Sequence, residues 1–117
     1  MMNNINYYPT NIILQNSQNI IKLYHSINQK ATNTVYVEGI PLDATEREVA
    51  HIFRPFPGFI TLRLIKREKN GKLTSLCFVD FETILQSTIC ILTLQGYRFD
   101  KNDSIGLHLS YGVRTKN

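Results

Sequence analysis

The sequence predicts an α+β domain whose elements follow the order strand, helix, strand, strand, helix, strand. Four runs of apolar residues alternating with polar ones predict the strands, and two stretches with apolar residues at helical spacing predict the helices. A helix that connects two strands of one sheet must cross a face of that sheet and cover it. We therefore expect a ferredoxin-like βαββαβ sandwich, with two helices on one face of a four-stranded antiparallel sheet.

The composition divides the chain into three segments. Residues 1–31 contain no acidic residue and are rich in Asn and Gln, which predicts a disordered or weakly helical tail. Residues 32–113 have the composition of one globular domain, and residues 114–117 form a short basic tail.

A short docking helix is an alternative for part of the first tail. Apolar residues recur there at helical spacing, at Ile20, Leu23, Tyr24 and Ile27. So short an isolated helix is marginal in water, which favours the interpretation as a tail with scattered apolar residues.

Charge and cysteine content narrow the classes of partner. The net charge of +4 favours a polyanionic partner or an acidic surface, without identifying either. Cys77 and Cys90 lie in apolar runs and are expected to be reduced core residues of an intracellular protein, with no second pair to complete a zinc site. The start of the chain lacks the features of a signal peptide or membrane span. We therefore expect no metal, cofactor, membrane or small-molecule substrate.

The first strand and helix are marked by local signals. Residues 34–39 alternate as a strand, and Thr45 followed by Glu48 has the form of a capping box that starts a helix. Val49, Ile52 and Phe53 supply its apolar stripe. The helix is expected to stop at Arg54, because the residue before a proline is disfavoured in the helical region.

A strand pair follows. Ile60, Leu62 and Leu64 alternate with more polar residues in a second strand, which leads into a charged loop at residues 66–72. Asn70-Gly71 in this loop is a strong turn signal. The third strand is expected over residues 73–81.

The second helix rests on a weaker pattern. Residues 83–94 carry an apolar stripe at helical spacing, with Gly96 placed to end the helix; the stripe consists of Ile84, Leu85, Thr88, Ile89 and Leu92. The many β-branched residues would also suit a strand, but a connection across the sheet favours a helix. The last strand alternates over Leu107, Leu109 and Tyr111.

Strand phase singles out two aromatic residues. Side chains alternate between the faces of a strand, so Val35 and Val37 can enter the core only if Tyr36 leaves it. By the same rule, Leu76 and Phe78 lie on the face opposite to Cys77 and its apolar neighbours. Aromatic rings on an open sheet face are typical of surfaces on which nucleic-acid bases stack.

With that order and those rings, residues 32–113 resemble an RNA recognition motif. The run VYVEGI (35–40) matches the shorter signature of that family, and TSLCFVDF (74–81) occupies the longer one. The family consensus has a cation and an aromatic ring where this chain has Thr74 and Leu76. These departures concern the affinity for RNA and leave the fold unaffected.

The sequence shares longer runs with a narrower group of proteins within this family. The run FRPF-x-G (53–58), with LCFVDF and LQGYRFD downstream, is similar to plant nuclear speckle RNA-binding proteins. It is similar more distantly to the animal RNA-binding protein with multiple splicing and couch potato group. The resemblance implies a nuclear protein that acts in pre-mRNA processing or splicing on single-stranded RNA. Some animal relatives pair their domains, which implies a possible homodimer.

The resemblance also implies roles for residues of the open face. Tyr36 and Phe78 are expected to stack bases. By strand phase, the candidates for reading base edges on the same face are Glu38, Arg63, Asp80, His108 and Ser110, and Leu76 belongs to that face as well. Basic residues of the 66–72 loop and of the C-terminal tail are expected to contact phosphates, namely Lys66, Arg67, Lys69, Lys72, Arg114 and Lys116.

Two alternatives belong to other functional classes. Small acyl phosphatases share the βαββαβ order but need an arginine in the loop after the first strand; residues 39–43 contain no cation, and Glu38 and Asp43 would repel a phosphate. We therefore expect no enzymatic activity. A protein-interaction module is the other alternative. Dimerisation would use apolar residues off the main stripe of the second helix, such as Ile91, and peptide binding would use Arg98.

Overall fold

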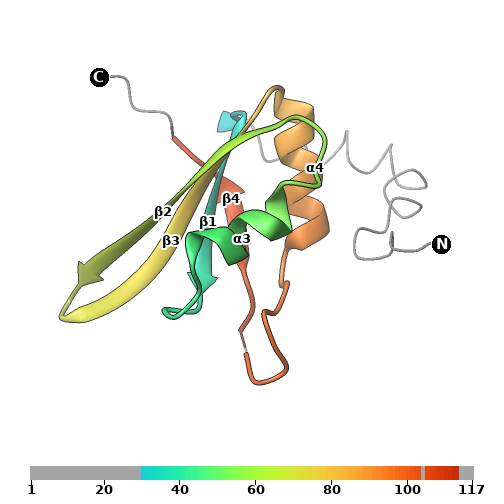
Figure 1. Cartoon of the computed structure of the whole chain (residues 1–117). Helices are drawn as coiled ribbons and strands as arrows, with labels where there is room; N and C mark the ends of the chain where they lie inside the picture. The colour runs from blue at the N-terminus through green and yellow to red at the C-terminus, as the bar shows by residue number, and fades with distance from the viewer. Residues whose placement is uncertain (1–29, 104, 114–117) are drawn as a thin grey trace.

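The computed structural model describes residues 30–103 and 105–113, and the order of elements is the predicted one (Figure 1). The tail interpretations for residues 1–29, and the phosphate contacts expected of Arg114 and Lys116, lie outside the described residues. The elements are β1 (Thr34–Ile40), α3 (Glu46–Phe53), β2 (Phe59–Lys69), β3 (Lys72–Phe81), α4 (Ile84–Leu94) and β4 (His108–Tyr111).

The four strands form one antiparallel sheet in the order β2-β3-β1-β4. The core lies on one side of it, because Val37 of β1 and Val79 of β3 pack in one cluster with Phe53 of α3 and Ile91 of α4. Both helices therefore cover the same face, and the opposite face is open, which confirms the ferredoxin-like prediction. The two thiols, predicted as core residues, are free and buried, and burial raises the pKa of Cys77 to about 12.

Each helix begins with a reciprocal cap. Thr45 accepts a hydrogen bond from the Glu48 backbone N–H and the Glu48 side chain accepts one from the Thr45 N–H, as predicted. Thr83 and Gln86 form the same arrangement at α4, a signal that the sequence reasoning missed. This second cap helps to explain why a segment rich in β-branched residues is a helix. Gly96, with a φ of 82°, turns the chain just after α4.

The charged segment at residues 66–72 is a β-hairpin, so the prediction of a loop was wrong. β2 continues to Lys69 and β3 begins at Lys72, which leaves Asn70-Gly71 as a two-residue turn. Both turn residues have positive φ, 55° and 74°, as a type I′ turn requires. The hairpin extends beyond the ends of β1 and β4 (Figure 1). Water on both of its faces removes the apolar alternation that marks a strand in sequence.

Two predictions of core-facing residues were also wrong. Ile60 is 54% exposed, because the pairing of β2 with β3 shifts between Phe59 and Thr61 and breaks the alternation there. On α4, Leu85 is 53% exposed, whereas Ile91 is only 7% exposed and belongs to the core. The dimer surface predicted at Ile91 is therefore not available. Because α4 has apolar residues on nearly every side, helical spacing does not indicate which face is buried.

Candidate nucleic-acid interface

A row of four side chains crosses the open face at its centre. The strand register pairs Arg63 with Phe78, Phe78 with Tyr36, and Tyr36 with Ser110. The rings of Tyr36 and Phe78 are half-buried, with centroids 5.3 Å apart and planes inclined by 44°. The predicted strand phase is therefore confirmed, since these rings lie opposite the core.

Arg63 caps one end of this aromatic pair. Its guanidinium carbon lies 5.2 Å from the centroid of the Phe78 ring, in cation–π contact. The side chain is itself exposed on the edge strand β2. A base that stacks on this face of Phe78 would therefore replace the guanidinium there, and the displaced planar donor group can bond to base edges or stack with them.

Tyr36 is held by its neighbour two residues along the strand. Its hydroxyl donates a hydrogen bond to Glu38 Oε2 at 2.9 Å, and both side chains lie on the open face. Partial burial, and then this bond to the Glu38 carboxylate, raise the pKa of Tyr36, while Arg67 acts in the opposite direction. The phenol is therefore neutral at physiological pH and its ring is oriented.

The remaining residues that were predicted to read bases differ in solvent exposure and in the hydrogen bonds that they already make. His108 of β4 pairs with Glu38 of β1 and is exposed, and Ser110 is half-buried at the end of the row. Asp80 accepts a hydrogen bond at 2.6 Å from the buried Thr34 hydroxyl, so one of its carboxylate oxygens is already engaged.

Leu76 is not part of the accessible surface. It lies in the same strand phase as Phe78 and pairs with Ile65, yet it is only 4% exposed. Neighbouring side chains have closed over it. The prediction that Leu76 belongs to an open sheet face was therefore wrong, because strand phase assigns a side but not a depth.

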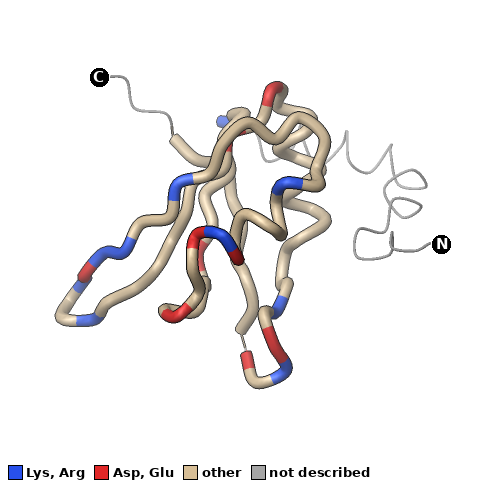
Figure 2. The backbone as a smooth tube through the Cα atoms, viewed as in Figure 1, with Lys and Arg blue, Asp and Glu red and all other residues tan. Residues whose placement is uncertain are grey.

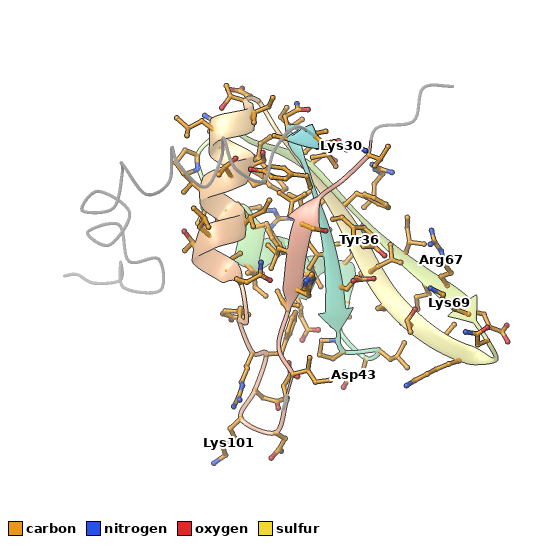
Figure 3. The ribbon with its side chains drawn as sticks, turned by 180° about the vertical axis from the view of Figure 1, so that it is seen from behind. Lys30, Tyr36, Asp43, Arg67, Lys69 and Lys101 are labelled. Atoms are coloured by element: carbon orange, nitrogen blue, oxygen red, sulfur yellow. The ribbon has the colours of Figure 1, made fainter. Side chains whose placement is uncertain are left out.

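The basic residues of the hairpin divide between its two sides. Arg67, Lys69 and Lys72 share the strand phase of Arg63 and Phe78, and Lys69 pairs directly with Lys72. Figure 3 shows Arg67 and Lys69 projecting from the hairpin, and Figure 2 shows positive charge along it. Lys66 has the opposite phase, and its ammonium donates a hydrogen bond to the Leu42 carbonyl at 2.6 Å. The structure thus separates Lys66 from the other three predicted phosphate contacts.

Three further observations concern metal, membrane and peptide sites. Residues 30–103 and 105–113 contain no group of three or more His, Cys, Asp or Glu placed to hold a metal ion. Among the same residues, no helix combines the length and apolar character needed to cross a bilayer. Near Arg98, which the peptide-binding alternative requires, Tyr97 and Phe99 pack edge to face and contact the core.

Comparison with known proteins agrees with this geometry. The family model of the RNA recognition motif matches residues 35–104. Nuclear speckle RNA-binding protein A of Arabidopsis thaliana is 48% identical over 77 residues, which are 63% of this chain and 33% of that protein. Protein couch potato of Drosophila melanogaster is 35% identical over 85 residues, 72% of this chain and 14% of that protein. The chain therefore spans a third or less of the length of these relatives.

A solved structure extends the comparison to a complex with RNA. The C-terminal RRM domain of MEC-8, bound to AGCACA, aligns with a TM-score of 0.58 and 28% sequence identity. The alignment covers 72% of this chain and 94% of that domain. The order of elements, the open sheet face, the matched signatures and these relatives agree, and the chain belongs to the RNA recognition motif family.

Proposed function

We propose that this chain binds single-stranded RNA on its open sheet face, with one base on Tyr36 and one on Phe78. The observation that carries the proposal is the row of Arg63, Phe78, Tyr36 and Ser110, which places two adjacent rings among polar groups. Stacking on each ring is worth about 1–3 kcal/mol and tolerates any base. The RNA recognition motif typically uses such rings to hold two or three bases.

Polar groups around the rings would supply selectivity. Glu38 and Asp80 can accept hydrogen bonds from base amino groups, and Arg63, His108 and Ser110 can donate them. Glu38 and Asp80 each keep acceptor positions beyond the bonds to Tyr36 and Thr34. The C-terminal residues Arg114 and Lys116 are proposed to cross the face beside the last strand.

The hairpin would carry the phosphate contacts. Arg67, Lys69 and Lys72 project on the side of the stacking rings, and residues two apart on a strand are separated by about 7 Å. Three contacts to a single strand predict a slope of about −2 in a plot of log affinity against log salt. Lys66 is left out of this set, because it is bonded to the Leu42 carbonyl.

The test compares ring variants on one RNA. AGCACA is a suitable first probe because the related MEC-8 domain is bound to it, and a poly(U) oligomer of equal length gives a reference. We expect Tyr36→Ala and Phe78→Ala each to weaken binding to both oligomers while circular dichroism stays unchanged. Unaltered binding by both variants would exclude the sheet face as the RNA site.

We further propose a role in pre-mRNA processing or splicing in the nucleus. Support comes from similarity to Nuclear speckle RNA-binding protein A and from the resemblance of the FRPF-x-G run. Crosslinking in cells followed by sequencing of the bound RNA tests the role, with Phe78→Ala as the control. Recovery of intron-containing transcripts by the unsubstituted chain alone is the expected outcome, and recovery of mature transcripts only would contradict it.

A homodimer through the edge strand β2 is a second candidate function. A groove of about 500 Å³ lies between α3 and β2, where Ile60 is exposed beside Glu46, Arg47 and Arg54. Sedimentation of the chain and of Ile60→Asp tests this: a dimer that the substitution dissociates is expected, and a monomer at high concentration would refute it.

A further inference from the structure

The outward face of α4 is apolar, although it lies on the surface. No residue of Ile84–Leu94 is charged, and Figure 2 shows the helix without positive or negative residues. Leu85 is exposed, and Ile89 and Leu92 are only half-buried. These three residues follow the i, i+4, i+7 spacing, so they form one stripe, on the side away from the buried Cys90 and Ile91.

An apolar outer face without charged residues is typical of a helix that is covered on both its inner and its outer side. Surface helices normally carry charged residues on the outer face, and α3 does so with Glu48 and His51. The core covers only the inner side of α4. We therefore expect another segment or molecule to cover the outer stripe of Leu85, Ile89 and Leu92.

We propose that residues 20–27 of the same chain form a short helix that packs on this stripe. Ile20, Leu23, Tyr24 and Ile27 lie on one side of such a helix, while Lys22, His25 and Ser26 lie on the other. A helix of eight residues is about 12 Å long, close to the roughly 10 Å from Leu85 to Leu92. A helix that is marginal alone gains its stability from packing of this kind.

The first described residues of the chain lie beside α4. The Ser87 hydroxyl in the first half of α4 donates a hydrogen bond to the Thr32 carbonyl at 2.7 Å. Figure 3 shows Lys30 at the same end of the molecule as the start of α4. Ile27 and Ala31 are four residues apart, so their Cα atoms can be separated by at most about 14 Å, which keeps Ile27 within reach of the outer stripe of α4.

The shortest connection to Ala31 favours one direction of packing, with the end of the segment near the start of α4. With Ile27 near Leu85, the segment runs antiparallel to α4, and Ile20 falls near Leu92. Leu23 and Tyr24 then lie against Ile89. Four apolar side chains on the segment thus meet three on α4, all on the side of the sheet opposite the RNA face. The proposal is therefore independent of RNA binding.

The experiment measures thermal unfolding of the full chain with matched charge substitutions. We expect Leu23→Asp to lower the Tm by about 5–10 °C through the lost packing, and Ser26→Asp, on the opposite side of the segment, to leave it unchanged. Deleting residues 1–18 should also leave the Tm unchanged. Equal Tm values for the Leu23 and Ser26 variants would overturn the proposal.

A substitution on α4 identifies the partner of the segment. Leu85→Asp introduces a negative charge in the first turn of α4, where it is favourable, so this change alone has little reason to destabilise an uncovered helix. We expect it to lower the Tm as Leu23→Asp does, with no further loss when the two are combined. A decrease for Leu85→Asp alone that depends on protein concentration would show a second copy on this face and refute the proposal.

Should Leu85→Asp fail to fold, Leu92→Asn at the other end of the stripe serves in its place. In the methyl NMR spectrum, Leu23→Asp is expected to shift the signals of Leu85, Ile89 and Leu92, and Ser26→Asp is not. Unmoved methyl signals in both variants would show that residues 20–27 do not cover α4.

Discussion

Truncation of the two stacking rings tests the proposed RNA site most directly. Tyr36→Ala or Phe78→Ala removes one base stack, a loss of about 1–3 kcal/mol. The dissociation constant should then rise about 5- to 150-fold for any single-stranded sequence. Each change also removes the contact between the two rings, which costs the fold about 0.5–1.5 kcal/mol. A domain stable by 5 kcal/mol or more, the usual range, stays folded after that loss.

The assay combines fluorescence anisotropy with thermal unfolding, so that binding and stability are separated. Val37→Ala is the matched control, because Val37 is 0% exposed on the opposite face of the same strand. It should lose about 2 kcal/mol of stability through two methyl groups and the cavity that they leave. RNA affinity of the folded Val37 variant should be unchanged.

Two outcomes would refute the reasoning. If both ring variants bind RNA like the original chain, bases do not stack on Tyr36 and Phe78. If the ring variants unfold while Val37→Ala stays stable, the rings act as core residues and the assigned faces of β1 are inverted. A combined variant should weaken binding more than either change alone, because each ring holds a separate base.

Four further predictions follow from the same structure. Lys69→Ala with Lys72→Ala should weaken binding to all RNAs alike and reduce the salt slope by about 1.4, measured by titration at several salt concentrations; an unchanged slope would remove the hairpin from the site. Ile91→Glu should unfold the domain by circular dichroism, because Ile91 is a core residue of α4, and a folded monomer would contradict that placement. Leu76→Phe should lower the Tm, since an overpacked buried site costs about 1–3 kcal/mol, and tighter RNA binding at unchanged Tm would show that the ring reaches the surface. Hydrogen bonds from the Gly106 and Phe99 backbone N–H groups lower the pKa of the Asp103 carboxyl. The ionised carboxylate therefore stabilises the fold above about pH 4, and this contribution is lost as the pH falls through the lowered pKa of the folded state. Asp103→Asn should reduce this acid-dependent loss of stability in melting curves recorded from pH 6 to pH 2.

Signals that act between close neighbours in the chain predicted most of the elements, although the second helix also needed the topology of the sheet, and the strands of the hairpin at residues 66–72 were not predicted. The capping box at Thr45 requires only residues three apart, and the turn at Asn70-Gly71 only two that tolerate positive φ. Strand alternation placed Tyr36 opposite Val35 and Val37, because a side chain cannot share a face with its immediate neighbour. The sequence by itself therefore determined the βαββαβ order and the face that carries the two rings.

The burial of each side chain and the register between strands depend on parts of the chain that are distant in sequence. Only the tertiary structure decided them. Leu76 has the phase of an open-face residue but is covered by neighbouring side chains. Lys66 differs from Lys69 because the Leu42 carbonyl lies within reach of its ammonium group. The shifted pairing near Ile60 exposes a residue that alternation assigned to the core.

The same distinction explains the second helix. Helical spacing identifies a face only when one side is polar, and α4 is apolar on nearly every side, so docking against the sheet selected Ile91 for the core and left Leu85 outside. The row that aligns Arg63, Phe78, Tyr36 and Ser110 has the same origin. Its members come from four strands, and no local pattern fixes which residue of one strand lies opposite which residue of the next.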